Sequence, residues 1–101
     1  MKKIIKGKLY DTDTAIEIGN WSNGYPWSDF HCEYETLYKK KTGEYFLFAE
    51  GGPLSEHRER IGDGWTYGES IIPMSIGEAK SWAEGKLDMD EYISEFGCPE
   101  E

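Results

Sequence analysis

The sequence predicts an α+β fold in a single domain, residues 1–101: a small antiparallel sheet with a central hairpin, packed against two C-terminal helices and a short N-terminal helix. Three observations predict it. Apolar and polar residues alternate on both sides of a glycine turn within residues 33–50. Two helix-capping patterns each precede an apolar stretch near the C-terminus. The length of 101 residues suits one domain, and the 15% of aromatic residues can supply its core.

The hairpin is predicted from residues 33–40 and 44–50, which flank a turn that ends at Gly43. Gly43 offers the positive φ that a tight hairpin turn requires. Along the first strand, a period of two places alternate side chains on opposite faces of the sheet. One set is Tyr34, Thr36 and Tyr38, and the other is Glu35, Leu37 and Lys39.

Residues 3–10 predict a short strand that bends at Gly7. Residues 69–72 predict another brief strand, which Pro73 is expected to stop. Between the hairpin and this strand, residues 55–61 are expected to form a helical turn, because their first residue is a serine that can cap it.

Residues 13–18 are expected to form the short N-terminal helix, because the polar side chains before them can cap it and Gly19 can end it. A strand is the alternative. Residues 19–29 are rich in glycine, asparagine, serine and proline, which favours a loop. This loop carries three aromatic residues that either fold back on the core or face a partner: Trp21, Tyr25 and Trp27.

The two C-terminal helices are predicted from repeated capping boxes, Ser75 with Glu78 and Asp88 with Glu91. Each helix also has a stripe of apolar residues at helical spacing, which is expected to be buried against the sheet. In the first helix the stripe is Ile76, Ala79, Trp82 and Ala83, and in the second it is Tyr92, Ile93 and Phe96.

The charge is strongly acidic and unevenly distributed. Twenty Asp and Glu residues against eleven Lys and Arg residues give a net charge of −9. Residues 1–41 carry a net charge of +1, whereas residues 42–101 carry −10. Such a charge repels nucleic acid and anionic membranes and attracts basic surfaces. Solubility alone is the alternative explanation.

The sequence predicts a cytoplasmic protein in its host cell. The apolar residues of the N-terminus are too few for a signal peptide, since Lys6 interrupts them. No apolar run approaches the roughly 20 residues that cross a membrane. Cys32 and Cys98 are therefore expected to stay reduced.

No catalytic residue, metal site or cofactor is predicted. His31, Cys32, His57 and Cys98 do not have the spacing of zinc ligands. The glycines of residues 50–53 stand beside a carboxylate and a proline, whereas a phosphate-binding loop needs cations and N–H donors. A small enzyme with Cys32 as nucleophile and His57 as base is an alternative, because such partners need only meet in space.

The acidity itself provides the main candidate site. Carboxylates on outward positions of the C-terminal helices can imitate the phosphates of a duplex and occupy a basic nucleic-acid channel. The candidate partner-binding carboxylates are Glu78, Glu84, Asp88, Asp90, Glu91 and Glu95. The alternative contact is the aromatic loop, through Trp21 and Trp27.

Several stretches of the chain together resemble a family of small, mostly uncharacterised proteins of bacteriophages and mobile elements. They are residues 10–15, 35–44, 50–55 and 71–75, with Glu78-Ala79 and residues 82–84. Some small acidic proteins from that genetic setting are anti-CRISPR inhibitors, and several of those act as DNA mimics. The chain departs from the pattern at Ala49, where a bulkier or polar residue is expected.

The leading hypothesis is therefore a phage or mobile-element inhibitor of anti-CRISPR type. It would bind the basic nucleic-acid-binding surface of a host protein, such as a CRISPR effector subunit, as a DNA mimic. The first alternative is a non-enzymatic protein-interaction domain that binds through the aromatic loop. The second is the small Cys/His-dependent enzyme. Carboxylate-driven binding should weaken steeply with salt, whereas aromatic burial should not.

Overall fold

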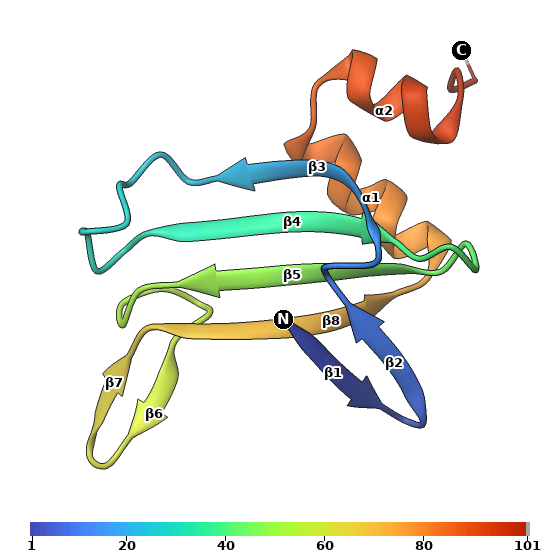
Figure 1. The fold of residues 1–101 in the computed structure, drawn as a ribbon. Helices are drawn as coiled ribbons and strands as arrows, with labels where there is room; N and C mark the ends of the chain where they lie inside the picture. Colours follow the sequence, from blue (N-terminus) through green and yellow to red (C-terminus); the bar gives the residue numbers. More distant parts are fainter. Residues whose placement is uncertain (101) are drawn as a thin grey trace.

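The computed structural model describes residues 1–100, and its element order confirms the predicted α+β class. Figure 1 shows strands side by side in one sheet, two hairpins that leave it, and both helices following the last strand. The described elements are β1 (Lys2–Ile5), β2 (Lys8–Asp11), β3 (Ile16–Ser22), β4 (Glu33–Lys39), β5 (Tyr45–Gly51), β6 (Glu59–Ile61), β7 (Gly64–Thr66), β8 (Gly68–Met74), α1 (Ile76–Lys86) and α2 (Met89–Phe96).

The main sheet is antiparallel with strand order β3-β4-β5-β8. Its centre is the predicted hairpin, which is confirmed: β4 pairs with β5 from Glu33↔Gly51 to Lys39↔Tyr45. Gly43 in the turn has φ 94°, as the sequence required. Strand β8 does not stop at Pro73 but continues to Met74. Proline lacks a backbone N–H, and an edge strand such as β8 tolerates this because no strand pairs with its outer side.

The expected short helix over residues 13–18 is wrong, and the strand alternative is correct. Asp11 accepts a hydrogen bond from the backbone N–H of Asp13 at 2.9 Å and so closes a turn instead of capping a helix. Strand β3 then begins at Ile16 and pairs with β4 as far as Ser22. Pairing with β4 outweighs the weak local helix signal, because β-branched residues fit a sheet better than a helix.

Two further expectations need correction. The single bent strand over residues 3–10 is a hairpin, because Lys6 and Gly7 both adopt positive φ, 51° and 80°, and reverse the chain between β1 and β2. The expected helical turn over residues 55–61 is absent from the described structure. The Ser55 hydroxyl donates to the Gly52 carbonyl, and the chain continues into β6 of the second hairpin.

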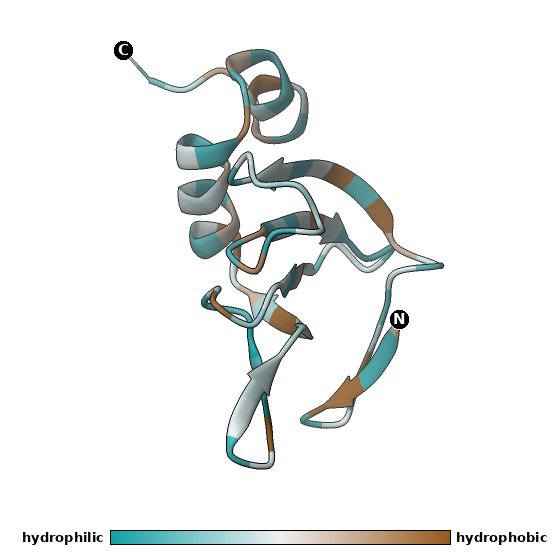
Figure 2. Ribbon diagram, turned by 90° about the vertical axis from the view of Figure 1, so that its left-hand side faces the viewer, coloured by the Kyte–Doolittle hydropathy of each residue, from teal (hydrophilic) through white to brown (hydrophobic). Residues whose placement is uncertain are grey.

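Both predicted helices are confirmed, together with their capping boxes. In α1, Ser75 Oγ accepts from the N–H of Glu78 at 3.1 Å, and the Glu78 carboxylate accepts from the N–H of Ser75 at 2.9 Å. Asp88 and Glu91 make the same reciprocal pair in α2. Figure 2 shows both helices on one side of the sheet and the β1–β2 hairpin on the other.

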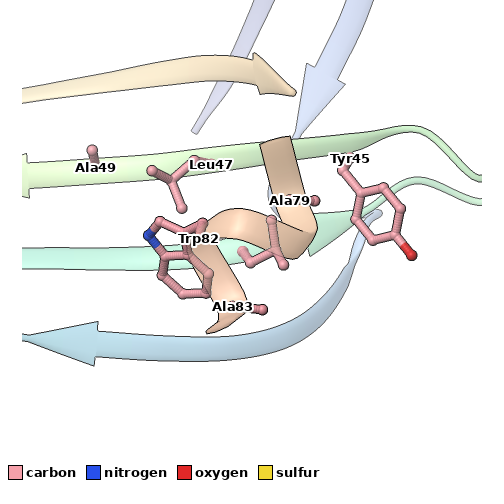
Figure 3. Packing of buried hydrophobic residues seen from close by; sticks show 7 residues of the cluster. Tyr45, Leu47, Ala49, Ala79, Trp82 and Ala83 are labelled. Carbon is pink, nitrogen blue, oxygen red and sulfur yellow. The ribbon is translucent and has the colours of Figure 1, made fainter. Parts of the chain in front are cut away.

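The helix-side core confirms most of the predicted packing. Trp82 is 8% exposed and packs with Ala79, Ala83 and the inward residues of β4 and β5 (Figure 3). Tyr92 and Phe96 pack against the same cluster. Ile76, the first residue of α1, is 60% exposed, so its predicted place in the buried stripe was wrong.

A second core lies on the opposite face of the sheet. Tyr10 from the β1–β2 hairpin packs edge-on against Phe46, with ring centroids 5.4 Å apart, and Ile71 joins them from β8. Tyr38 stacks on Phe46 at 5.3 Å. The β1–β2 hairpin therefore covers this face of the sheet near the β4–β5 turn.

Candidate functional site

The loop between β3 and β4 carries two exposed aromatic rings that meet others from the sheet. Trp27 is 47% and Phe30 57% exposed. The Trp27 ring contacts Tyr34 of β4 and Tyr67 before β8, with centroids 5.6 and 4.8 Å apart. Phe30 meets Tyr67 edge-on at 6.5 Å. These contacts join the rings into one surface. The β3–β4 loop and the start of β8, which bring them together, lie at the end of the sheet remote from the β4–β5 turn (Figure 1).

Tyrosine hydroxyls hold this loop against the sheet. Tyr34 Oη donates to the Tyr25 carbonyl and Tyr67 Oη to the Trp27 carbonyl, both at 2.9 Å. The Cys32 thiol also donates to the Trp27 carbonyl, at 3.7 Å. The backbone beside the indole therefore has fixed partners, which lowers the entropy cost of presenting Trp27 to a ligand.

Three carboxylates adjoin these rings. Glu50 and Glu69 are direct cross-strand partners on β5 and β8, and Tyr34 is the partner of Glu50 on β4. Glu59 of β6 reaches the start of β8, where its carboxylate accepts from the N–H of Glu69 at 3.3 Å. Together with Trp27 and Tyr67 they line an open pocket of about 290 Å³. Partial burial, with a smaller effect of the Glu69 charge, raises the pKa of Glu50.

The six candidate helix carboxylates do not form one row. Glu78, Asp88 and Glu91 each belong to a capping box, so their oxygens are engaged with backbone N–H groups. The six candidate carboxylates lie in three separate places on the helix side of the sheet. Glu78 is beside the β4–β5 turn, Glu84 and Asp88 are at the junction of the helices, and Asp90, Glu91 and Glu95 line a groove of about 430 Å³ between α2 and β3.

The outward position expected for Glu95 is wrong. Its side chain is 15% exposed and forms an ion pair with Lys39 at 3.0 Å. It also accepts a hydrogen bond from the Tyr45 hydroxyl. Both partners lie at the β4–β5 turn end of the sheet, and Glu95 joins α2 to that end. Asp90 and Glu91 remain exposed in the groove, beside Glu17 of β3.

The two candidate tryptophans occupy different surroundings. Trp21 lies in β3, not in the loop, and packs against the helix-side core. Its ring receives the Lys86 ammonium at 4.1 Å from the centroid. Trp27 belongs to the exposed aromatic surface. Of the two, Trp27 is the more exposed, whereas Trp21 is partly buried beside the helix layer.

Sequence reasoning missed a buried ionic cluster around Glu35. The Glu35 carboxylate accepts from Trp82 Nε1 at 2.7 Å and from Lys86 Nζ at 2.6 Å, both from α1. Its other oxygen meets His57 Nε2 at 2.7 Å. Glu35 itself is 5% exposed. The sequence signal was a glutamate on the face of β4 that also carries the core residue Leu37.

These contacts set the ionisation of the cluster. Burial alone would raise the pKa of Glu35, but the hydrogen bonds from His57, Lys86 and Trp82 outweigh it and lower this pKa to about 2. The hydrogen bond to Glu35 raises the pKa of His57, against the opposite effect of burial. The cluster therefore fixes the 52–58 loop and α1 to the sheet most strongly when His57 is protonated.

A pH dependence of stability follows. Because the pKa of His57 is raised, its contribution is complete below its ordinary value of 6.5 and is lost as pH rises through the raised value. The Glu35 contribution to stability is present above its ordinary pKa of 4.5 and is lost as pH falls towards 2.

Urea unfolding should show that the free energy of unfolding falls as pH rises above 6.5. The variant His57→Gln should remove this fall, and the control variant His31→Gln should keep it. An unchanged fall in His57→Gln would contradict this assignment.

The groups suggested for a small enzyme have structural partners. Cys32 is fully buried and its thiol is bonded to the Trp27 carbonyl, and Cys98 is an exposed free thiol. His57 is 12% exposed and its Nε2 is bonded to Glu35. Within residues 1–100, no group of three histidine, cysteine or acidic side chains is arranged to hold a metal ion.

Comparisons with protein-family models, curated proteins and solved structures gave no match. The resemblance to small proteins of phages and mobile elements therefore stays a prediction. Neither described helix has the length and apolar character to span a membrane.

Proposed function

We propose that this protein is a non-enzymatic binding protein that docks its aromatic surface against a basic protein partner. Here the aromatic surface means Trp27, Phe30, Tyr34 and Tyr67. The observation that carries the proposal is the contact of Trp27 with Tyr34 and Tyr67 while Trp27 stays half exposed. Grouped, exposed aromatic rings are typical of interaction sites, and tryptophan and tyrosine contribute most of the energy in many interfaces.

The charge supports a basic partner. Glu50, Glu59 and Glu69 adjoin the aromatic surface, and the chain carries a net charge of −9. Lysine- and arginine-rich surfaces are the means by which nucleic-acid-binding proteins contact phosphates. Occupation of such a surface would exclude nucleic acid. This agrees with the inhibitor role of phage or mobile-element origin that the resemblance implies, and with the host cytoplasm expected from the N-terminal sequence. The aromatic surface takes the leading role because the helix carboxylates are dispersed over three places.

The test is affinity capture from bacterial lysate with the full chain and two sets of variants. Trp27→Ala should abolish capture of the specific partner, because it removes the centre of the aromatic surface. The paired change Glu84→Lys with Asp90→Lys should leave that capture almost unchanged. Both positions are exposed, and neither residue caps a helix. Circular dichroism should show native folding of all variants.

The opposite result would favour the DNA-mimic mechanism. If the charge reversals abolish capture and Trp27→Ala keeps it, the helix carboxylates make the contact and the aromatic proposal is wrong. The dependence of partner affinity on ionic strength is a second, independent measurement. A contact made of exposed carboxylates alone should weaken steeply between low and high ionic strength. A contact centred on Trp27, with carboxylates only beside it, should weaken less steeply.

A further inference from the structure

One wall of the pocket of about 290 Å³ is aromatic. Trp27 and Tyr67 line it, with ring centroids 4.8 Å apart and planes inclined by 43°. The rings contact each other, so they form one continuous wall and leave no slot between them. A flat cation can lie on such a wall, since the face of an aromatic ring carries negative potential.

The rest of the pocket is formed by carboxylates without a basic partner. Glu50 and Glu69 face each other across β5 and β8, and Glu59 joins them from β6. Among residues 1–100, none of the three forms an ion pair with a lysine, arginine or histidine. Like charges directly opposite in a sheet destabilise it. The Glu50 and Glu69 carboxylates therefore repel each other across the two strands, and a bound cation would reduce this repulsion.

The backbone holds these groups together before any ligand arrives. Gly68 packs so closely that a Cβ there would lie 2.1 Å from the His57 carbonyl oxygen and 2.7 Å from Cγ of Glu59. This close approach brings β6 against the start of β8, so Glu59 meets Glu69. The Tyr67 hydroxyl fixes the Trp27 backbone on the other side. The pocket is thus preformed.

We propose that this pocket binds the guanidinium group of an arginine side chain presented by the basic partner. The inference rests on the proposed function, and it names the chemistry that the aromatic surface recognises. Arginine fits better than lysine because its planar head stacks on a ring while its N–H groups donate to carboxylates in the plane. In the same protein the guanidinium of Arg58, just before β6, lies over the Trp65 ring of β7, 4.3 Å from its centroid.

The test is a titration of the ¹⁵N-labelled full chain, followed by NMR, with N-acetyl-arginine amide. Saturable shifts are expected at the Trp27 indole N–H and at the amides of Gly68 and Glu69. N-acetyl-citrulline amide, the neutral isostere, should cause none, and the lysine analogue should bind several-fold more weakly. The double variant Glu50→Gln with Glu69→Gln should weaken arginine binding about tenfold. Asp90→Asn, in the groove beside α2, is the matched control and should leave it unchanged.

The double variant should also fold at least as stably as the original chain, because it removes the repulsion between facing carboxylates. Equal shifts with citrulline or equal affinity for lysine would overturn the arginine assignment, as would unchanged binding by the double variant. If arginine does not bind but Trp27→Ala still abolishes partner capture, this inference fails and the proposed function stands. If arginine binds in the pocket but Trp27→Ala keeps partner capture, the proposed function fails instead.

Discussion

Replacing Trp82 by alanine is expected to lower the free energy of unfolding by about 3–5 kcal/mol, the usual cost of removing a large buried aromatic side chain. Trp82 belongs to the buried cluster that includes Leu37 of β4. It packs between α1 and Leu47 of the central hairpin (Figure 3). Its indole N–H also donates to the buried Glu35 carboxylate, so the substitution removes a hydrogen bond in addition to the packing.

Urea unfolding followed by circular dichroism measures this loss. Ile76→Ala is the matched control in the same helix, because Ile76 is 60% exposed. Its effect should stay within about 0.5 kcal/mol, as for surface substitutions. A loss below about 1 kcal/mol for Trp82→Ala, or equal losses for the two variants, would contradict the packing of α1 on the sheet.

Replacing Glu35 by alanine is expected to cost about 3 kcal/mol, at the lower end of the range for removing one member of a buried ion pair. The change leaves the Trp82 N–H, the Lys86 ammonium and the His57 ring without their shared acceptor. Lys86 is partly exposed and can turn towards water, which limits the loss. Glu35→Gln should cost less, because it keeps a carbonyl oxygen as acceptor.

Glu84→Ala provides the control for this second variant, since Glu84 is an exposed carboxylate on α1 and should change stability by less than about 0.5 kcal/mol. Hydrogen exchange gives a second measurement. Glu35→Ala should speed exchange in the 52–58 loop, which the His57 contact holds to the sheet. Unchanged stability and exchange would show that the cluster does not tie the loop and α1 together.

The sequence by itself determined the elements whose signals are local. Ser75 with Glu78 and Asp88 with Glu91 located both helices, because a capping box is completed within four residues. Gly43 located the central hairpin, because a tight turn depends on the φ of its own residues. Local propensity misjudged residues 13–18, since their conformation depends on pairing with β4, about twenty residues away.

Only the tertiary structure decided the candidate site and the ionic cluster. Trp27 and Tyr67 are 40 residues apart in the chain and meet through one hydrogen bond and one ring contact. Glu50 faces Glu69 only because β8 returns beside β5. Glu35 receives Lys86 because α1 crosses that face of the sheet. The physical reason is common to all three: each contact depends on strand order and helix placement, which the packing of the whole chain sets and no short stretch of sequence encodes.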